Sequence, residues 1–508
     1  MTLRRPAVHM FRPRGQRETD QAWRFWFWAV LAETTTWRIA MAAIMGVCFD
    51  ECYYHYWSLF PQLSYYDHPP LTAWMMHLSG MAFGESIWTV RLWPLLGGTV
   101  FVLAGRALAR RLFGQPSADR AGIMLSLTPL LLGNGLIMTP DTLLAPCWAL
   151  ALYFAWRAIE QRTALSPWWI AAGLCAGIGA LSKYPMALFF MGLALFWTAE
   201  SAMRAKTWRG ALICGVLTLV MFLPVIIWNS RNGWVSIRFQ LGHGFSNDGA
   251  VISLPKLADY LATSLIVVTP LLCALCAWSS CRAMFRGDAA RRFAGSFFLA
   301  VAAVFGAAAL RGSSEANWVM PAFISGIVLV AGDWDSYALW LRRATLGLLA
   351  AAAALICAGV PAFVLFPGPL SSMTIVAPKL KEVVGSPELA SSVRRVKEEQ
   401  GADVVCALSH QLFGRLSYYA PDMRSSLYVI SRGKLRFPWI NPAQWEGKRV
   451  LIVSDKSNEP DFSTHLRHYK DLGSADISCA GGYVIRGVRY CVGKLQALSH
   501  QRSSAEGP

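Results

Sequence analysis

The sequence predicts a polytopic α-helical membrane protein that carries a small α/β domain at its C-terminus. Of its 508 residues, 55% are hydrophobic and only 15% are charged, whereas soluble domains carry about 25% charged residues. Apolar segments recur up to about residue 368, and the chain then becomes polar and strand-like. These three observations exclude an ordinary soluble protein.

The apolar segments predict a helical bundle that spans a membrane. A helix needs about 20 mostly apolar residues to cross a bilayer, and about eleven segments fit that description. Some are short and joined by tight turns. The expected spans centre on residues 30–49, 88–108, 121–138, 142–158, 167–182, 186–200, 210–228, 257–279, 293–310, 317–333 and 344–366.

The Lys and Arg residues set the orientation of the bundle, because cytoplasmic loops are enriched in them. Counted over alternate loops, most of these residues fall on the side of the N-terminus. Residues 1–27 are therefore expected to form a cytoplasmic tail before the transmembrane domain at 28–368. This tail lacks the pattern of a cleaved signal peptide.

The formal net charge of +17 does not indicate a nucleic-acid partner, because the basic residues are scattered between apolar segments. With an odd number of spans, residues 370–508 lie outside the cytoplasm. The runs "ADVVCAL", "RVLIVSD" and "GYVIRGVRYCVG" in this region are typical of strands. Cys479 and Cys491 flank a possible hairpin, and the sequence leaves open whether they form a disulfide or remain free thiols.

Polar residues that interrupt the apolar pattern gather in the loops assigned to the outer side. The first outer loop, at 50–87, begins with Asp50 and Glu51 and continues to Asp67 and His68. Because acids at membrane depth are costly, they usually mark sites or pathways. The later outer loops add Asp141, Lys183, His243, Asp248 and Glu315.

Two helical stretches of the first outer loop, "ECYYHYWSLF" and "LTAWMMHLSGMAF", are aromatic and rich in Met. We expect them to lie in the membrane interface with their apolar faces in the acyl chains. Pro69 and Pro70 restrict the residues before them to extended geometry. The loop is therefore expected to hold Asp67 and His68 at the membrane surface.

Each polar residue also has a structural explanation. Asp50 and Asp141 are at positions where an acid caps a helix, and Lys183 is placed to reach lipid headgroups. His243 is in a Gly-containing loop that suits a solvated His, and Glu315 suits a simple water interface. No metal motif of strong spacing is present, and Cys273 and Cys276 are expected to behave as small hydrophobes.

Seven segments occur in order along residues 50–324: "DECYYHYW", "YYDHPPLTAW", "GESIWTVRLWP", "MTPDTLL", "LSKYPMAL", "WNSRNGWVSIRFQ" and "EANWVMPAF". Together they resemble the bacterial membrane-embedded GT-C glycosyltransferases. The resemblance is to the branch of protein O-mannosyltransferases, the lipid A aminoarabinose transferase and the rhizobial lipopolysaccharide galacturonosyltransferases. It covers about two thirds of the chain, and the tail segment "SHQLFGRLSYYAPD" is similar more weakly.

The resemblance implies transfer of a sugar from a polyprenyl-phosphate donor on the outer side of the bacterial inner membrane. Asp50 matches the catalytic acid, with Glu51 beside it, and Asp67 and His68 match the second site. In the aminoarabinose branch this second site helps to bind a divalent metal, which here implies Asp67 and His243. That branch has Lys at the position of His68, so its phosphate contacts are not assumed here.

The residues suit a direct displacement that inverts the anomeric centre. A base must take the proton of the acceptor hydroxyl, and Asp50 is the expected base. The leaving phosphate needs positive charge, for which His68, Lys183 and Arg231 are candidates. Asp141 and Glu315 would position the sugar or the acceptor.

Two other functions remain open on the sequence. A transporter or lipid flippase would place charged residues near the bilayer midplane, usually with repeated halves, and no internal repeat is visible here. A non-catalytic envelope-assembly protein is the second alternative. The sequence names neither the sugar nor the acceptor, which we expect to be an envelope glycolipid or glycan.

Overall fold

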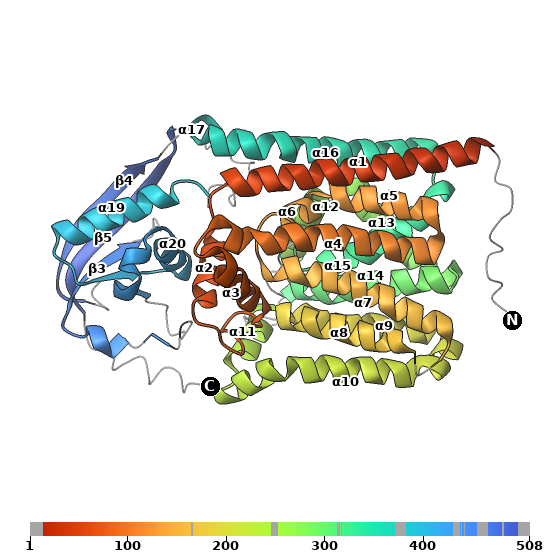
Figure 1. Cartoon of the computed structure of the whole chain (residues 1–508), viewed down its shortest axis with the longest axis horizontal. Coiled ribbons are helices and arrows are strands. Elements are labelled where there is room, and N and C mark those ends of the chain that lie inside the picture. Colours follow the sequence, from red (N-terminus) through yellow and green to blue (C-terminus); the bar gives the residue numbers. More distant parts are fainter. Residues whose placement is uncertain are drawn as a thin grey trace.

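The computed structural model is a long helical bundle with an α/β domain at one end (Figure 1). The N-terminal end of α1 lies at the opposite end of the bundle (Figure 1). The structure describes residues 14–163, 166–244, 252–311, 315, 317–370, 383–429, 437, 439–440, 442–454, 466–479 and 482–495.

Five helices are long and apolar enough to cross a membrane within the described part of the chain. They are α4 (Ile87–Phe113), α7 (Pro140–Gln161), α10 (Ser201–Arg231), α14 (Ala289–Arg311) and α16 (Leu339–Leu365). The bent pair α12 (Leu254–Val268) and α13 (Pro270–Arg286) raises this number to six if it is one span. The structure thus contains the expected apolar bundle, whereas the count of about eleven spans stays a prediction.

The other helices of the bundle region are shorter or more polar. They are α1 (Arg14–Ile44), α5 (Gln115–Leu127), α6 (Pro129–Asn134), α8 (Pro167–Ser182), η1 (Tyr184–Ala187), α9 (Leu188–Ala199), α11 (Val235–Gly244), α15 (Met320–Asp333), η2 (Trp334–Ser336) and α17 (Pro367–Leu370).

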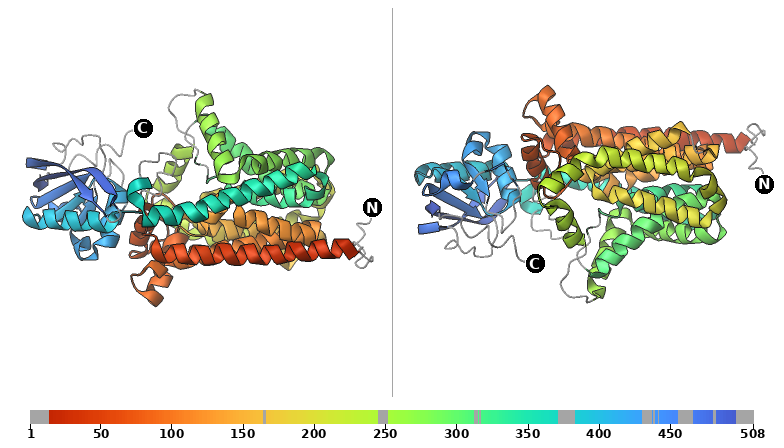
Figure 2. Two further views of the ribbon diagram at one scale, coloured as in Figure 1. Left: turned by 90° about the horizontal axis from the view of Figure 1, so that it is seen from above. Right: turned by 90° about the horizontal axis from the view of Figure 1, so that it is seen from below.

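Two segments expected to be continuous helices are broken by a proline. The segment 121–138 divides into α5 and α6 at Thr128, and 257–279 divides into α12 and α13 at Thr269. In both cases the next residue is Pro, which lacks an N–H and disfavours helical geometry in the residue before it. The second break turns the helix axis by 107°, and α12 points away from the bundle (Figure 2).

The first outer loop forms α2 (Phe49–Ser58) and α3 (Leu71–Phe83). Eight of the ten residues of α2 are buried, because α20 of the C-terminal domain packs directly on it. The expectation that α2 lies in the lipid interface is therefore wrong. In contrast, α3 exposes Leu78, Met81 and Phe83, as expected for an interfacial helix.

The C-terminal part is an α/β domain with one mixed five-stranded sheet in the order β2-β1-β3-β5-β4. Strands β1 to β3 are parallel, whereas β5 runs antiparallel to both β3 and β4. Registers that fix the sheet include Val405 with Leu427 and Ile452 with Cys491. Its elements are α19 (Ser386–Glu399), β1 (Val404–Ala407), α20 (His410–Tyr419), η3 (Pro421–Ser426), β2 (Leu427–Val429), η4 (Pro442–Trp445), β3 (Arg449–Ser454), β4 (Leu466–Ser478) and β5 (Val484–Leu495).

Alternate residues of the strands bury on opposite faces of the sheet, as strand geometry requires. Val405 and Leu451 join a core with α20 and α2, whereas Cys406 and Ile452 face a separate core. Cys479 belongs to the first core and Cys491 to the second, and both are free thiols. The core that α2 shares with the sheet makes the first outer loop the junction between the two parts.

Candidate active site

Helix α2 begins at the acidic pair that ends the first apolar segment. Asp50 and Glu51 are in its first turn, where the helix dipole favours negative charge. Cys48 is the N-cap, and its backbone N–H donates to Oε2 of Glu51 at 3.0 Å. This contact is half of a capping box, in which the third helical residue satisfies the N-cap amide.

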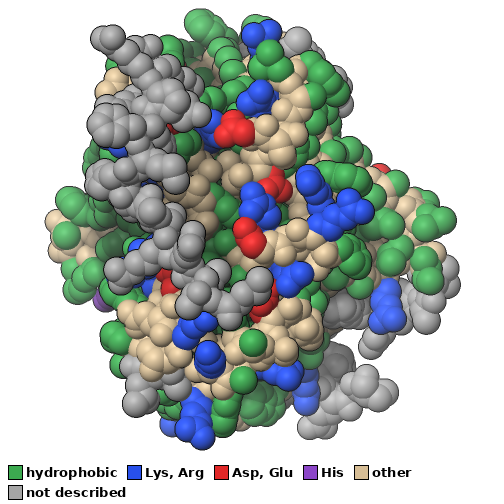
Figure 3. All heavy atoms as spheres, turned by 90° about the vertical axis from the view of Figure 1, so that its right-hand side faces the viewer, with side chains coloured by type: hydrophobic (Ala, Val, Ile, Leu, Met, Phe, Trp, Pro, Cys, Tyr) green, Lys and Arg blue, Asp and Glu red, His purple; other side chains and the backbone are tan. Residues whose placement is uncertain are grey.

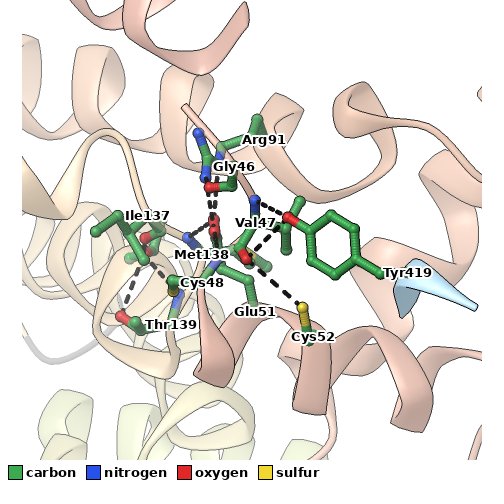
Figure 4. Close-up of polar contacts among 11 residues, drawn as sticks. Gly46, Val47, Cys48, Glu51, Cys52, Arg91, Ile137, Met138, Thr139 and Tyr419 are labelled. Carbon is green, nitrogen blue, oxygen red and sulfur yellow. Dashed lines mark hydrogen bonds and ion pairs between the residues drawn. The ribbon is translucent and has the colours of Figure 1, made fainter. Parts of the chain in front are cut away.

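Glu51 is held by a buried arginine (Figure 4). Nε of Arg91 donates to Oε1, and Nη2 donates to Oε2, each at 2.8 Å. The backbone N–H of Met138 also donates to Oε1 at 2.9 Å, and Nη2 of Arg91 donates to the carbonyl of Gly46. The pair thereby joins the end of α1, the start of α2, α4 and the segment before α7.

This arrangement bears on our expectation for Glu51. Both side chains of the ion pair are fully buried, and both oxygens of Glu51 already accept hydrogen bonds. The geometry therefore favours a structural role for Glu51 over the catalytic role that we expected. Arg91 is in the first turns of α4.

Asp50 has a different environment from its neighbour. It is half-buried, at the second position of α2. Tyr54 follows four residues later, so the two side chains are on the same face of the helix. Burial raises the pKa of the Tyr54 phenol well above its ordinary value, and Asp50, Asp67 and Asp141 raise it further. The charges of three acids from three parts of the chain therefore act on one buried phenol, which keeps its proton.

Asp67 and His68 lie between α2 and α3, as the prolines after them predict. Asp67 is buried, and its Oδ2 accepts a hydrogen bond of 2.6 Å from the hydroxyl of Tyr53. The side chain of Gln240, on α11, donates to the backbone carbonyl of Asp67. His68 is half-buried, with its ring edge-on to that of Tyr54 at 6.1 Å between centroids.

Asp141 and Lys183 form a second buried ion pair in the same region. Nζ of Lys183, at the C-cap of α8, lies 2.7 Å from Oδ2 of Asp141, at the start of α7. The Nδ2 of Asn317 donates to the same oxygen at 2.8 Å. The other oxygen, Oδ1, is buried and has no partner among the described residues. Lys183 is thus neutralised by Asp141, and Oδ1 can accept a hydrogen bond from a ligand.

Other expected site residues are not part of this group. Arg231 and Glu315 are exposed, and it is Asn317, two residues after Glu315, that reaches Asp141. The side chain of His243 and the whole of Asp248 lie outside the described residues.

The metal expectation finds no support in the part of the chain that the structure describes. That part contains no group of three or more His, Cys, Asp or Glu residues able to hold a metal ion. One oxygen of Asp67 is already bound by Tyr53. The described residues thus do not assemble a metal site, and we route no step of the reaction through a metal.

Sequence reasoning missed four residues of the site: Tyr53, Tyr54, Arg91 and Asn317. The spacing of four residues between Asp50 and Tyr54 was a usable signal, because it places both on one helix face. The pairing of Glu51 with Arg91 joins residues 40 apart in sequence. No local pattern shows such a contact.

Comparisons with known proteins show which families the chain is similar to. A model of the family described as dolichyl-phosphate-mannose-protein mannosyltransferase matches residues 67–228. The lipid A galacturonosyltransferase RgtD of Rhizobium johnstonii is 24% identical over 83% of this chain and 89% of its own length. An undecaprenyl phosphate-alpha-4-amino-4-deoxy-L-arabinose arabinosyl transferase of Pseudomonas aeruginosa is 28% identical, over 32% of this chain and 30% of its own length.

The fold is that of a solved member of the same group. The crystal structure of ArnT from Cupriavidus metallidurans bound to undecaprenyl phosphate matches with a TM-score of 0.60. The match covers 94% of this chain and 98% of that one, at 17% sequence identity. The chain thus shares its fold with that enzyme, and the family match and the relatives make it similar to bacterial membrane glycosyltransferases.

Proposed function

We propose that the protein transfers a sugar from a polyprenyl-phosphate donor to a lipid A-type acceptor, with inversion at the anomeric carbon. The observation that carries this proposal is that the buried Asp67 and Asp141 and the half-buried Asp50 all act by their charge on Tyr54 of α2, the helix between the apolar bundle and the C-terminal domain (Figure 1). Such a donor has a lipid tail and a polar head, so its site must lie where apolar helices meet a polar domain. The relative RgtD, matched over most of its length, is a lipid A galacturonosyltransferase.

In the proposed reaction, the acceptor hydroxyl attacks the anomeric carbon of the sugar, and the bond from that carbon to the phosphate oxygen breaks. The polyprenyl phosphate leaves with the electron pair, and a carboxylate takes the hydroxyl proton. Asp50 is our assignment for that base, because it is half-buried on the face of α2 that carries Tyr54. Glu51 is excluded from this assignment by its pairing with Arg91.

The other residues are assigned by their contacts. The open Oδ1 of Asp141 would accept a hydrogen bond from a sugar or acceptor hydroxyl, while Lys183 and Asn317 fix its orientation. His68, beside Tyr54, remains the candidate to contact the leaving phosphate. A buried, fixed donor or acceptor needs little reorganisation during the reaction, and such groups contribute strongly to catalysis.

We also propose that the chain lies in the bacterial inner membrane with its N-terminus in the cytoplasm. The C-terminal domain, from about residue 370, would then lie in the periplasm. The distribution of Lys and Arg between loops supports this orientation. A reporter fused near residue 370 tests it, since a cytoplasmic signal there would overturn the proposed site of reaction.

The function is tested by purifying the full chain and measuring transfer to lipid A. Two donors are compared, undecaprenyl-phosphate galacturonate and undecaprenyl-phosphate 4-amino-4-deoxy-L-arabinose. Mass spectrometry of lipid A and core from a deletion strain gives the matching result in cells. We expect the mass of one sugar to disappear in that strain and to return with the wild-type gene. An unchanged envelope together with no transfer from either donor would contradict the proposal, and would favour a transporter or an assembly protein.

A further inference from the structure

Tyr53 connects the candidate active site to the C-terminal domain. Its hydroxyl donates to Oδ2 of Asp67 at 2.6 Å. Its ring lies against that of His410, the first residue of α20, with centroids 4.8 Å apart, and against that of Phe437 at 5.7 Å. Tyr53 therefore contacts the C-terminal domain with its ring and Asp67 with its hydroxyl.

Helix α20 also touches the backbone of Tyr53. A Cβ added at Gly414 would lie 2.8 Å from the backbone nitrogen of Tyr53 and 3.0 Å from its Cα. Real Cβ atoms essentially never approach other atoms so closely. Gly414 follows His410 by one helical turn, so both residues are on the face of α20 that meets α2. Any other residue at 414 would push the two helices apart.

Two further contacts fix the domain on either side of α2. Before the helix, the hydroxyl of Tyr419 accepts from the backbone N–H of Val47 at 2.7 Å and donates to its carbonyl at 3.2 Å (Figure 4). After α3, Arg424 pairs with both oxygens of Glu85 at 2.8 and 2.7 Å. The orientation of α20 over Tyr53 is therefore set at three places.

We propose that the C-terminal domain contributes to catalysis by holding Tyr53 in place. Tyr53 is then a positioning residue, whose hydroxyl fixes the orientation of Asp67. This inference rests on the proposed glycosyl transfer. The phenol fixes one carboxylate oxygen of Asp67 through a hydrogen bond of 2.6 Å, so the orientation of that acid depends on where α20 holds the ring of Tyr53. The charge of Asp67 also acts on Tyr54 of α2. His68, the next residue in the chain, lies edge-on to the ring of Tyr54. Gln240 of α11 donates a hydrogen bond to the backbone carbonyl of Asp67.

The test compares three variants of the full chain with the wild type, using the two donors named above. Tyr53→Phe removes only the hydroxyl that reaches Asp67. Gly414→Ala separates α20 from α2 without changing a polar group. Gly359→Ala is the matched control, because it is also in a helix and its added Cβ would meet nothing within 4 Å.

For Tyr53→Phe we expect kcat to fall at least about 10-fold while the KM for the donor changes less, with an unchanged melting temperature, because Asp67 loses the hydrogen bond that fixes its orientation. Gly414→Ala should lose a similar part of its activity, and Gly359→Ala should keep all of it. A Tyr53→Phe protein with wild-type kcat would overturn the inference alone. A wild type inactive with both donors would overturn the proposed function and the inference together.

Discussion

The acidic residues at the two ends of the helical bundle have different surroundings. At the end away from the C-terminal domain, a few acidic side chains lie among more numerous basic ones on the exposed face (Figure 3). There, Arg111 pairs with Glu160 at 2.5 Å, and Arg291 pairs with Asp288 at 2.8 Å, with all four side chains at least 30% exposed. The buried acids of this end, Asp119 and Asp333, are paired with Arg106 and Arg291. At the end that meets the C-terminal domain, Asp67 and Asp141 are buried and Asp50 is half-buried, and all three raise the pKa of Tyr54.

This difference distinguishes acids that only form ion pairs from acids that can also bind a ligand or take part in a reaction. Exposed ion pairs contribute little to stability, typically about 0–1 kcal/mol. Burying an acid is expensive, so a chain that does so needs partners for it or a use for it. Glu51 has its partners in Arg91 and two backbone amides. Asp141 has one oxygen paired and the other open, which fits a site for a ligand.

The largest effect on stability is expected for Glu51→Gln. It leaves the fully buried guanidinium of Arg91 without a counter-charge, and breaking a buried pair in this way costs about 3–5 kcal/mol. Thermal unfolding of the detergent-purified protein measures the loss. The double variant Glu51→Gln, Arg91→Gln should recover part of it. Wild-type stability of the single variant would show that this pair does not hold the four segments together.

His55 makes the junction between α2 and the C-terminal domain sensitive to acid. The residue is buried edge-on to Tyr418, and burial lowers the pKa of its imidazole from 6.5 to about 4, with a smaller contribution from Arg424 and an opposing one from Glu85. Between these two pH values the unfolded chain binds the extra proton and the folded chain does not. Stability is therefore complete above about pH 6.5 and falls as the pH drops toward 4, by about 3 kcal/mol in total.

The measurement is the melting temperature of the wild type and of His55→Gln between pH 4 and pH 7.5. The wild type should lose stability as the pH falls through this window, and the variant should lose less. Parallel curves for the two proteins would mean that another group causes the acid sensitivity.

A smaller effect is expected from Arg424→Gln, which removes the ion pair between the C-terminal domain and Glu85. Because Glu85 is partly exposed, water weakens this pair, and the loss should be about 1 kcal/mol. We expect a modest drop in transfer rate, since the contacts at Tyr419 and Gly414 remain. Complete loss of activity would show that this pair alone holds the domain over the site.

The smallest effect is expected from Glu160→Gln at the opposite end. Its pair with Arg111 is exposed on both sides, so we expect a change below about 0.5 kcal/mol and normal transfer. A clear loss of transfer in this variant would remove the distinction between the two ends of the bundle.

The sequence predicted the apolar bundle and the mixed C-terminal domain well, because both follow from local composition. It predicted strands at β1, β3 and β5 but missed β2 and β4, since β2 has only three residues and β4 is largely polar. The breaks at Thr128 and Thr269 were missed although a proline marks each. In both places a continuous helix was predicted from the run of apolar residues, although the proline indicated a break.

The sequence predicted most of the acidic and basic residues of the site, but few of the contacts between them. The acids and Lys183 come from motifs that are visible in the sequence, and the structure joins Lys183 to Asp141. The burial of α2 could not be predicted from its own residues. It depends on Gly414 and Tyr419, more than 350 residues later in the chain, and aromatic residues suit an interface with lipid as well as one with protein.

The account depends most on the difference between two adjacent acids, and the transfer rate of Asp50→Asn measures it directly. With sugar transfer to lipid A followed under saturating donor, we predict a loss of about 100-fold or more at a melting temperature close to that of the wild type. Transfer by Asp50→Asn at or near the wild-type rate would contradict the account, because the proton of the acceptor hydroxyl would then have to go elsewhere.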